Sequence, residues 1–394
     1  MLQRAFLPFL RETELMLLRH IGLLGGTFDP IHSGHIALAR EALAYGLDEV
    51  WFVPSTPDYR KTVATGEQRV DMARLALDDK PGMKVSKVEV RHPGTTADIV
   101  ERLIKKNPDC RFTFIIGADK LPSLPKWRDA DRLFGQCELM CFPRPGTDMN
   151  KYLLSSVQAG ARFCIPDNAV RLDISATQVR EQLQDLQDPP EISAKVLRYI
   201  AMHSLYMPSW EEPLRRSITE KRFNHTLGVR STAVDLAIYW RGPGIKAAAA
   251  AMLHDCAKSM PLREARALVR KRNLEADEDE MTSNAMLHGP AGSILAMEKY
   301  QVTDPDVLNA IRYHTVGRPG MSLLEKIIFV SDMIEPGRED FEGLSAIRDM
   351  AFTDLDQAAL MCLRSTREYV LSQGKPFYPV SEQTISWFES ITEE

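Results

Sequence analysis

The sequence predicts two consecutive domains of different class, an α/β domain with a parallel sheet followed by an all-α domain. The chain has 394 residues, which exceeds the usual size of one domain. In the first half, short apolar runs alternate with helical patterns, as in strand–helix–strand units. After the proline-containing segment 207–213, strand patterns stop and helical patterns follow one another. We therefore expect a linker at 207–213 between domains at 20–206 and 214–394.

The composition narrows the classes of function and location. A net charge of −5 argues against a general nucleic-acid coat, and no apolar run reaches the ~20 residues of a membrane span. The six cysteines lack zinc-site spacing and lie in apolar surroundings, so we expect reduced core residues in a cytoplasmic protein. We expect no nucleic-acid or membrane partner. The apolar helices permit a homodimer without requiring one.

Residues 1–19 form a predicted N-terminal extension. Charged residues interrupt its apolar positions, which argues against a signal peptide. Met16 lies just before the first predicted strand and could be the true start of the protein. We therefore expect residues before Met16 to be dispensable for activity.

The stretch Gly25–His35 follows the apolar run Ile21–Leu24, which predicts a buried strand, a glycine turn and a helix starting near Ser33. Glycines at a strand end let the backbone approach a ligand closely, and amides at the following helix start face an anion. Only two residues separate His32 from His35, so a helical turn would place both imidazoles at this mouth. The stretch predicts a phosphate site, although the pattern of a P-loop is absent.

Further elements of the first half follow from its apolar periodicity. Strands are expected at residues 49–54, 85–90, 111–116, 139–143 and 163–165, and helices at 36–45, 68–77, 95–106 and from about 118. Ligands of parallel sheets bind at the carboxyl ends of strands. Four residues fall at such ends, namely Gly25, Pro54, Asp119 and Arg144.

A second motif runs from Asp173 to Arg180. Ser175 would cap a helix, and Arg180 lies one and a half turns into it. A helix N-terminus with an arginine makes a phosphate clamp. The loop 55–65 carries another cation, Lys61, that can reach a phosphate.

Residues 20–206 resemble bacterial nicotinate-nucleotide adenylyltransferases of the HxGH nucleotidyltransferase superfamily, which have a Rossmann-like α/β fold. The resemblance is carried by Gly25–His35, Thr95-Thr96, Gly117-Ala118-Asp119-Lys120, Trp127-Arg128, Arg144-Pro145-Gly146, Ile174–Arg180 and the tail Val196–Tyr206. It implies transfer of AMP from ATP to nicotinate mononucleotide, giving deamido-NAD and pyrophosphate, with Mg²⁺ bound mainly by substrate oxygens and water.

The resemblance also implies roles for single residues. His32, His35 and Arg180 would hold the ATP phosphates, and Thr96 and Trp127 would lie against the nicotinate nucleotide. The full set of expected nucleotide contacts is Gly25, Gly26, Thr27, Phe28, Thr96, Gly117, Asp119, Trp127, Arg144, Ser175 and Thr177. The family often has Pro-Pro-His-Lys where this chain has Pro57-Asp58-Tyr59-Arg60-Lys61. This difference leaves open where the loop directs the Lys61 side chain. Phosphopantetheine is an alternative acceptor, but the Trp127 region favours the nicotinate nucleotide.

Helices of the second half are expected at residues 214–217, 225–239, 245–256, 262–272, 291–299, 307–314, 323–334 and 346–371. These helices carry a set of imidazoles and carboxylates, a ligand combination that suits a first-row transition metal. The set is His225, His254, Asp255, His288, His314 and Asp332. We therefore expect a metal centre in this half.

The order His, His-Asp, Asp resembles the HD metal-dependent phosphohydrolase superfamily, and the flanking residues from Leu214 onward resemble its YqeK-like members. That family is similar to hydrolases that cut diadenosine tetraphosphate (Ap4A) symmetrically into two ADP at an iron-type centre. The resemblance implies a dinuclear centre bridged by Asp255. We therefore expect Asp255 to be a catalytic residue as well as a metal ligand. It places Lys258 and Arg338 near substrate phosphates. A nucleotidase, an enzyme acting on a signalling nucleotide and a non-catalytic nucleotide sensor are the alternatives.

Overall fold

The computed structural model describes residues 18–56, 62–143, 148–166, 174–274, 276 and 278–392. Its first compact unit comprises Met1–Glu181 and Pro189–Val196, and its second comprises Gln182–Asp188 and Leu197–Glu394. The boundaries expected at residues 206 and 214 stay a prediction. Met16, Lys61 and Arg144 lie outside the described residues.

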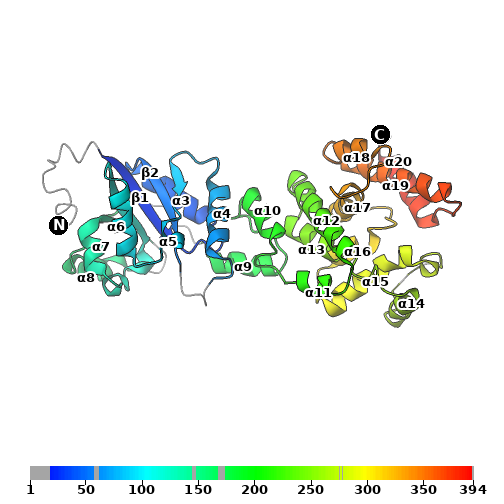
Figure 1. The fold of residues 1–394 in the computed structure, drawn as a ribbon, viewed down its shortest axis with the longest axis horizontal. Helices are drawn as coiled ribbons and strands as arrows, with labels where there is room; N and C mark the ends of the chain where they lie inside the picture. The colour runs from blue at the N-terminus through cyan, green and yellow to red at the C-terminus, as the bar shows by residue number, and fades with distance from the viewer. Residues whose placement is uncertain are drawn as a thin grey trace. The chain divides into compact units, whose positions relative to one another are not determined.

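The first unit contains a six-stranded parallel sheet in the order β3-β2-β1-β4-β5-β6. Two of its strands, β1 and β2, are labelled in Figure 1. Its strands are β1 Arg19–Gly26, β2 Glu49–Pro54, β3 Met83–Val85, β4 Cys110–Gly117, β5 Glu138–Phe142 and β6 Phe163–Cys164. Strand β1 pairs with both β2 and β4, so the strand order reverses beside it. Such a switch point is where ligands bind in open α/β sheets. The predicted Rossmann-like class is confirmed.

Helices connect these strands, and one further helix follows β6. They are α3 Ser33–Ala44, α4 Gly66–Leu77, α5 Val88–Arg91, α6 Thr96–Lys106, α7 Ala130–Gln136, α8 Met149–Gln158 and α9 Ala176–Gln184. One core joins apolar residues of β1, β4 and β5 to those of α6 and α7, with Leu103, Phe112 and Leu133 at most 4% exposed. This packing fixes the carboxyl ends of β1 and β4 relative to α6.

Two expectations for this unit were wrong. The strand expected at 85–90 ends at Val85, and Val88–Arg91 form helix α5, although the alternating valines are typical of a strand. The amide of Ser86 still donates to Phe52, but the helical turn then lets the Glu89 carboxylate accept from the Thr56 amide at 2.9 Å. From residue 118, a 3₁₀ turn, Ala118–Lys120, replaces the expected helix.

The second unit is helical, with no strand among its described residues. Its helices are α10 Ala194–Met202 (assigned to this unit from Leu197 onward), α11 Glu211–Arg215, α12 Glu220–Tyr239, α13 Gly244–Leu253, α14 Leu262–Lys271, α15 Asn284–Lys299, α16 Pro305–Tyr313, α17 Leu323–Ile334, α18 Leu344–Ala351, α19 Leu355–Ser372 and α20 Pro379–Thr392. The all-α class is therefore confirmed.

Several helix boundaries in this unit differ from expectation, and two of the differences have a clear cause. Helix α15 starts at Asn284 and continues through Pro290, because Ser283 caps it seven residues before that proline. The helix expected at 346–371 is divided into α18 and α19, because the Asp354 carboxylate accepts from the amides of Asp356 and Gln357 and starts a new helix.

The described helices include none that is both long enough and apolar enough to cross a bilayer. All six cysteines are free thiols, and five of them are buried. Burial raises the pKa of Cys137 and Cys256 to about 12, which suits inert core thiols.

Candidate nucleotide site and candidate metal centre

The carboxyl end of β1 passes between aromatic rings. A Cβ at Gly25 would lie 2.9 Å from the Phe114 ring, and a Cβ at Gly26 would lie 3.0 Å from the Phe28 ring. Any larger residue would therefore push these rings away. Phe28 is itself buried and has a φ of 51°, which turns the chain sharply after the strand. The glycines thus let the backbone turn closely at the switch point.

His32 and His35 begin helix α3 and lie against each other. Their ring centroids are 3.7 Å apart, and the His32 amide donates to His35 Nδ1 at 3.3 Å. The edge of Phe28 supports His35, with a centroid distance of 4.9 Å. His32 is 4% exposed. The structure thus brings the two imidazoles together, as the spacing predicts.

Arg180 joins the second motif to this turn. Its guanidinium donates to the backbone carbonyl of Asp29 at 2.6 Å and to Thr177 Oγ1 at 3.2 Å. Ser175 Oγ accepts from the Thr177 amide at 3.2 Å, at the start of α9. The two motifs, far apart in the sequence, therefore meet beside the carboxyl end of β1.

Two residues that shape this turn were missed by the sequence reasoning. The Asp29 carboxylate accepts from the amides of Val63 and Ala64 at 2.9 and 3.1 Å, and Arg69 donates to the Thr27 carbonyl at 2.6 Å. Asp29 lies inside the motif Gly25–His35, which is the signal that could have found it. Arg69 lies in a helix whose pattern gives no such signal.

The candidate acceptor side lies near the end of β4. Thr96 is the first residue of α6, whose cap is Thr95. The Trp127 ring meets the Phe114 ring edge-on at 6.4 Å, and Phe114 is the ring that also touches Gly25. Gly117 ends β4, and Asp119 follows it in the 3₁₀ turn. Trp127 and the glycine turn are thus linked through one phenylalanine.

In the second unit, the six candidate ligands converge from separate helices. They are His225 on α12, His254 and Asp255 after α13, His288 on α15, His314 after α16 and Asp332 on α17. Asp255 Oδ2 lies 3.4 Å from His254 Nε2, and its Oδ1 lies 3.1 Å from His288 Nε2. Asp332 Oδ1 lies 3.0 Å from His225 Nε2. The two oxygens of Asp255 therefore face different histidines.

This donor set fits divalent metal ions. The potential ligand atoms of His225, His254 and Asp332 lie within 4.8 Å of one another, as do those of His254, Asp255 and His314. Three of the imidazoles point Nδ1 at a backbone carbonyl, which leaves Nε2 for the cluster. These contacts are His254 to Ala251 at 2.6 Å, His288 to Asn284 at 3.2 Å and His314 to Ile311 at 2.7 Å.

The pKa shifts favour an ionised Asp255 and a neutral imidazole at His288, whereas at His254 the neighbouring carboxylates outweigh burial and raise the pKa. Burial alone would raise the pKa of Asp255, but the surrounding imidazoles, His254 first, hold it well below its usual range. Burial lowers the pKa of His288 to about 4, which keeps this imidazole in the form that binds metals.

Three cations border the cluster. Lys258 Nζ lies 3.7 Å from Asp255 Oδ1, and a guanidinium nitrogen of Arg338 lies 3.2 Å from Asp332 Oδ1. Arg222, which the sequence reasoning left without a role, donates to Asp255 Oδ2 at 2.6 Å. All three can reach an anion held at this cluster.

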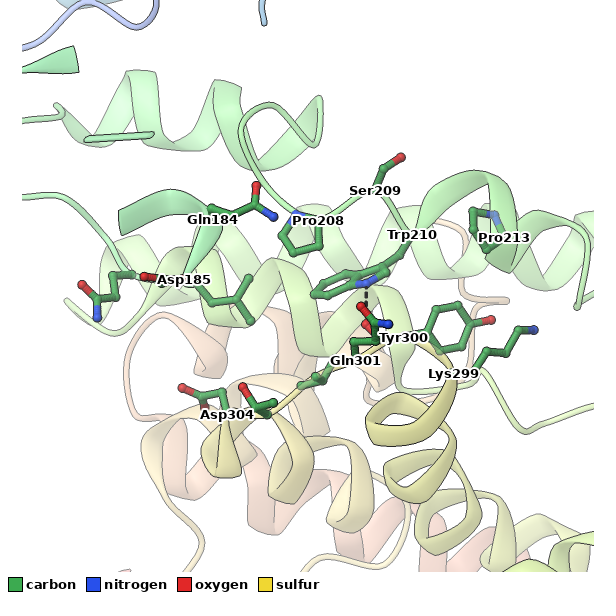
Figure 2. Close-up of a pocket in the computed structure, with 14 residues that line it drawn as sticks. Gln184, Asp185, Pro208, Ser209, Trp210, Pro213, Lys299, Tyr300, Gln301 and Asp304 are labelled. Atoms are coloured by element: carbon green, nitrogen blue, oxygen red, sulfur yellow. Dashed lines mark hydrogen bonds between the residues drawn. The ribbon is translucent and has the colours of Figure 1, made fainter. Parts of the chain in front are cut away.

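A cavity of about 860 Å³ lies elsewhere in the second unit (Figure 2). Its lining comes from residues 184–187, 208–210, 213 and 299–304, and Trp210 Nε1 donates to the Tyr300 carbonyl at 3.0 Å. None of the six candidate ligands lines it. This cavity is therefore separate from the candidate metal centre.

Fold and sites together define a nucleotidyltransferase-like α/β domain joined to an HD-type helical domain. The cytidylyltransferase-like family model matches residues 23–182, and the HD domain model matches residues 222–337. A Mycoplasma pneumoniae protein named "Probable nicotinate-nucleotide adenylyltransferase/Ap4A hydrolase" is 30% identical over 358 residues, 90% of this chain and 99% of the relative. The chain belongs to this family of two-domain proteins.

Relatives of each half exist separately. A symmetrical bis(5'-nucleosyl)-tetraphosphatase of Halalkalibacterium halodurans is 43% identical over 41% of this chain and 86% of that protein. A Bacillus pumilus protein named "Probable nicotinate-nucleotide adenylyltransferase" is 35% identical over 48% of this chain and 99% of its own length. Each half of the chain is thus similar to a separate, nearly complete protein.

Proposed function

We propose that the chain is a bifunctional enzyme. Its first domain transfers AMP from ATP to nicotinate mononucleotide, giving deamido-NAD and pyrophosphate. Its second domain hydrolyses Ap4A symmetrically to two ADP with the help of bound metal. The observation that carries the proposal is the presence, in one chain, of the His32–His35–Arg180 constellation and of six converging candidate metal ligands.

In the first domain, an oxygen of the mononucleotide phosphate attacks the α-phosphate of ATP, and pyrophosphate leaves. Positioning and fixed positive charge accelerate such a transfer without a covalent intermediate. His32, His35 and Arg180 hold the ATP phosphates, while Thr96 and Trp127 lie against the acceptor. Mg²⁺ accompanies ATP, bound mainly by phosphate oxygens and water. The roles expected for Lys61 and Arg144 remain predictions.

In the second domain, divalent transition metals would be held by His225, His254, Asp255, His288, His314 and Asp332, and iron is our first candidate. When bound, two metals supply an activated water and positive charge at the scissile phosphate. Asp255 could contribute to both metal positions, because its two oxygens face different histidines. Lys258, Arg338 and Arg222 offer further positive charge to substrate phosphates.

Product chromatography on the intact chain tests both activities. With ATP, Mg²⁺ and nicotinate mononucleotide, we expect deamido-NAD and pyrophosphate. With Ap4A, we expect ADP as the sole product, formed after loading with Fe²⁺ or Mn²⁺ and lost after chelation. Formation of ATP and AMP from Ap4A would contradict the symmetrical cut, and binding of Ap4A without cleavage would indicate a sensor.

A further inference from the structure

Among the four histidines of the candidate metal centre, His225 has a different partner for its Nδ1. His254, His288 and His314 direct Nδ1 at backbone carbonyls, whereas Nδ1 of His225 lies 3.1 Å from Oε1 of Glu335. We propose that Glu335 is a positioning residue that orients His225 for metal binding. This inference rests on the metal-dependent function proposed above and deepens it.

The Glu335 carboxylate is held on both oxygens. Glu335 is 3% exposed and follows the last residue of α17, three positions after Asp332. Its Oε1 faces His225, and its Oε2 accepts from the amide of Gly337 at 2.6 Å. A buried carboxylate held in this way has little freedom to turn, so it fixes the plane of the imidazole.

This contact determines which nitrogen of His225 faces the centre. A carboxylate accepts, so Nδ1 of His225 carries the proton and donates to Glu335. Nε2 then presents its lone pair 3.0 Å from Asp332 Oδ1, at the cluster. A carboxylate behind a ligating histidine also makes the imidazole a stronger ligand than a carbonyl does.

Gly228 provides the space that this carboxylate occupies. It lies one helical turn after His225 on α12, and a Cβ at this position would come within 2.4 Å of Glu335 Oε2. A methyl group here must therefore displace the carboxylate. The chain thus offers a second way to disturb the contact while leaving Glu335 itself in place.

Metal binding by the full-length chain tests the proposal. The metal-free protein is titrated with Mn²⁺ in a calorimeter, for wild type, E335Q, E335A, G228A and the double variant E335A/G228A. We expect E335A to weaken Mn²⁺ binding about 10–100-fold and E335Q to weaken it less, since the amide still accepts from Nδ1. G228A should weaken binding in the wild type but add nothing in E335A, because the clash is then gone.

Glu325 supplies the matched control. It is buried on the same helix α17, but it pairs with Arg318 and the amide of Ser322. E325Q should lower thermal stability and leave the Mn²⁺ affinity unchanged. ¹⁵N NMR gives an independent readout, since E335A should shift His225 away from the Nδ1–H tautomer.

Several outcomes would overturn the proposal. E335A binding Mn²⁺ as tightly as wild type, with an unchanged His225 tautomer, removes the positioning role and leaves the proposed function intact. Additive losses from G228A and E335A would likewise contradict the shared mechanism. A wild-type chain that binds neither Mn²⁺ nor Fe²⁺ would overturn this proposal together with the metal-dependent activity proposed for the second domain. Should E335A fail to fold, E335Q and G228A answer the same question.

Discussion

Single imidazoles carry much of the proposed chemistry, and their surroundings differ sharply. His32 and His35 lie against each other at a helix start, whereas the four histidines of the second unit point at two carboxylates. Sequence spacing predicts the first pair, because residues three apart on a helix are neighbours. Neither Glu335 nor Arg222 could be assigned a role in this way, since their contacts depend on how α12 packs against α17 and the turn after α13.

His35→Ala should lower adenylyl transfer by about 10²–10³-fold, because one donor to the developing negative charge is lost. The measurement is the rate of deamido-NAD formation at saturating substrates. His92 is an exposed histidine of the same unit, and His92→Ala is the matched control with an unchanged rate. A rate for His35→Ala close to wild type would remove His35 from the site.

His314→Ala should reduce the metal content from two ions per chain to one. His314 belongs to one candidate ligand group, while His225, His254 and Asp332 form another without it. Elemental analysis of the reloaded, desalted variant gives the stoichiometry. Two ions retained, or both lost, would contradict the assignment of separate groups.

His20 should make stability depend on pH. Burial, with repulsion by Arg111, lowers its pKa from 6.5 to about 4 in the folded state. Between these values the unfolded chain binds more protons, so the free energy of unfolding falls as the pH falls. Allowing for its partial exposure, we expect a loss of about 1–2 kcal/mol between pH 7 and pH 4. Urea unfolding at several pH values measures how the free energy of unfolding depends on pH, and this dependence should be weaker in His20→Gln. The same pH dependence in His20→Gln and wild type would contradict the role of His20.

Elements were predictable where one local signal dominates. The apolar runs at β1, β2, β4 and β5 gave strands because these strands are covered on both faces in a parallel sheet. The strand predicted at residues 85–90 was wrong because its alternating pattern fits a helical turn as well as a strand. The tertiary contact between Glu89 and the Thr56 amide favours the helical turn. The break between α18 and α19 depends on a cap, Asp354, inside an otherwise helical pattern.

Asp354→Ala should lower the free energy of unfolding of the helical unit by about 1 kcal/mol, because two amides at the start of α19 lose their acceptor. Asp354→Asn keeps an accepting oxygen and should stay close to wild type. Chemical denaturation measures both variants. Equal stability of the alanine and asparagine variants would show that the cap contributes little.

At the scale of the whole molecule, each compact unit holds one of the two candidate sites. All residues proposed to hold ATP lie in the first unit, and the six metal ligands lie in the second. The sequence predicted this division because the composition of the elements changes from strands with helices to helices alone. Packing adds a detail that composition cannot reveal, since Leu197–Tyr206 belongs to the helical unit.

The central claim is that one polypeptide handles phosphate at two independent sites. The most direct measurement compares both product-formation rates in the intact Asp255→Asn variant. We predict that ADP formation from Ap4A falls by at least about 10²-fold, while deamido-NAD formation from ATP and nicotinate mononucleotide stays at the wild-type rate. A parallel loss of both activities in a folded variant, or undiminished ADP formation, would contradict the account.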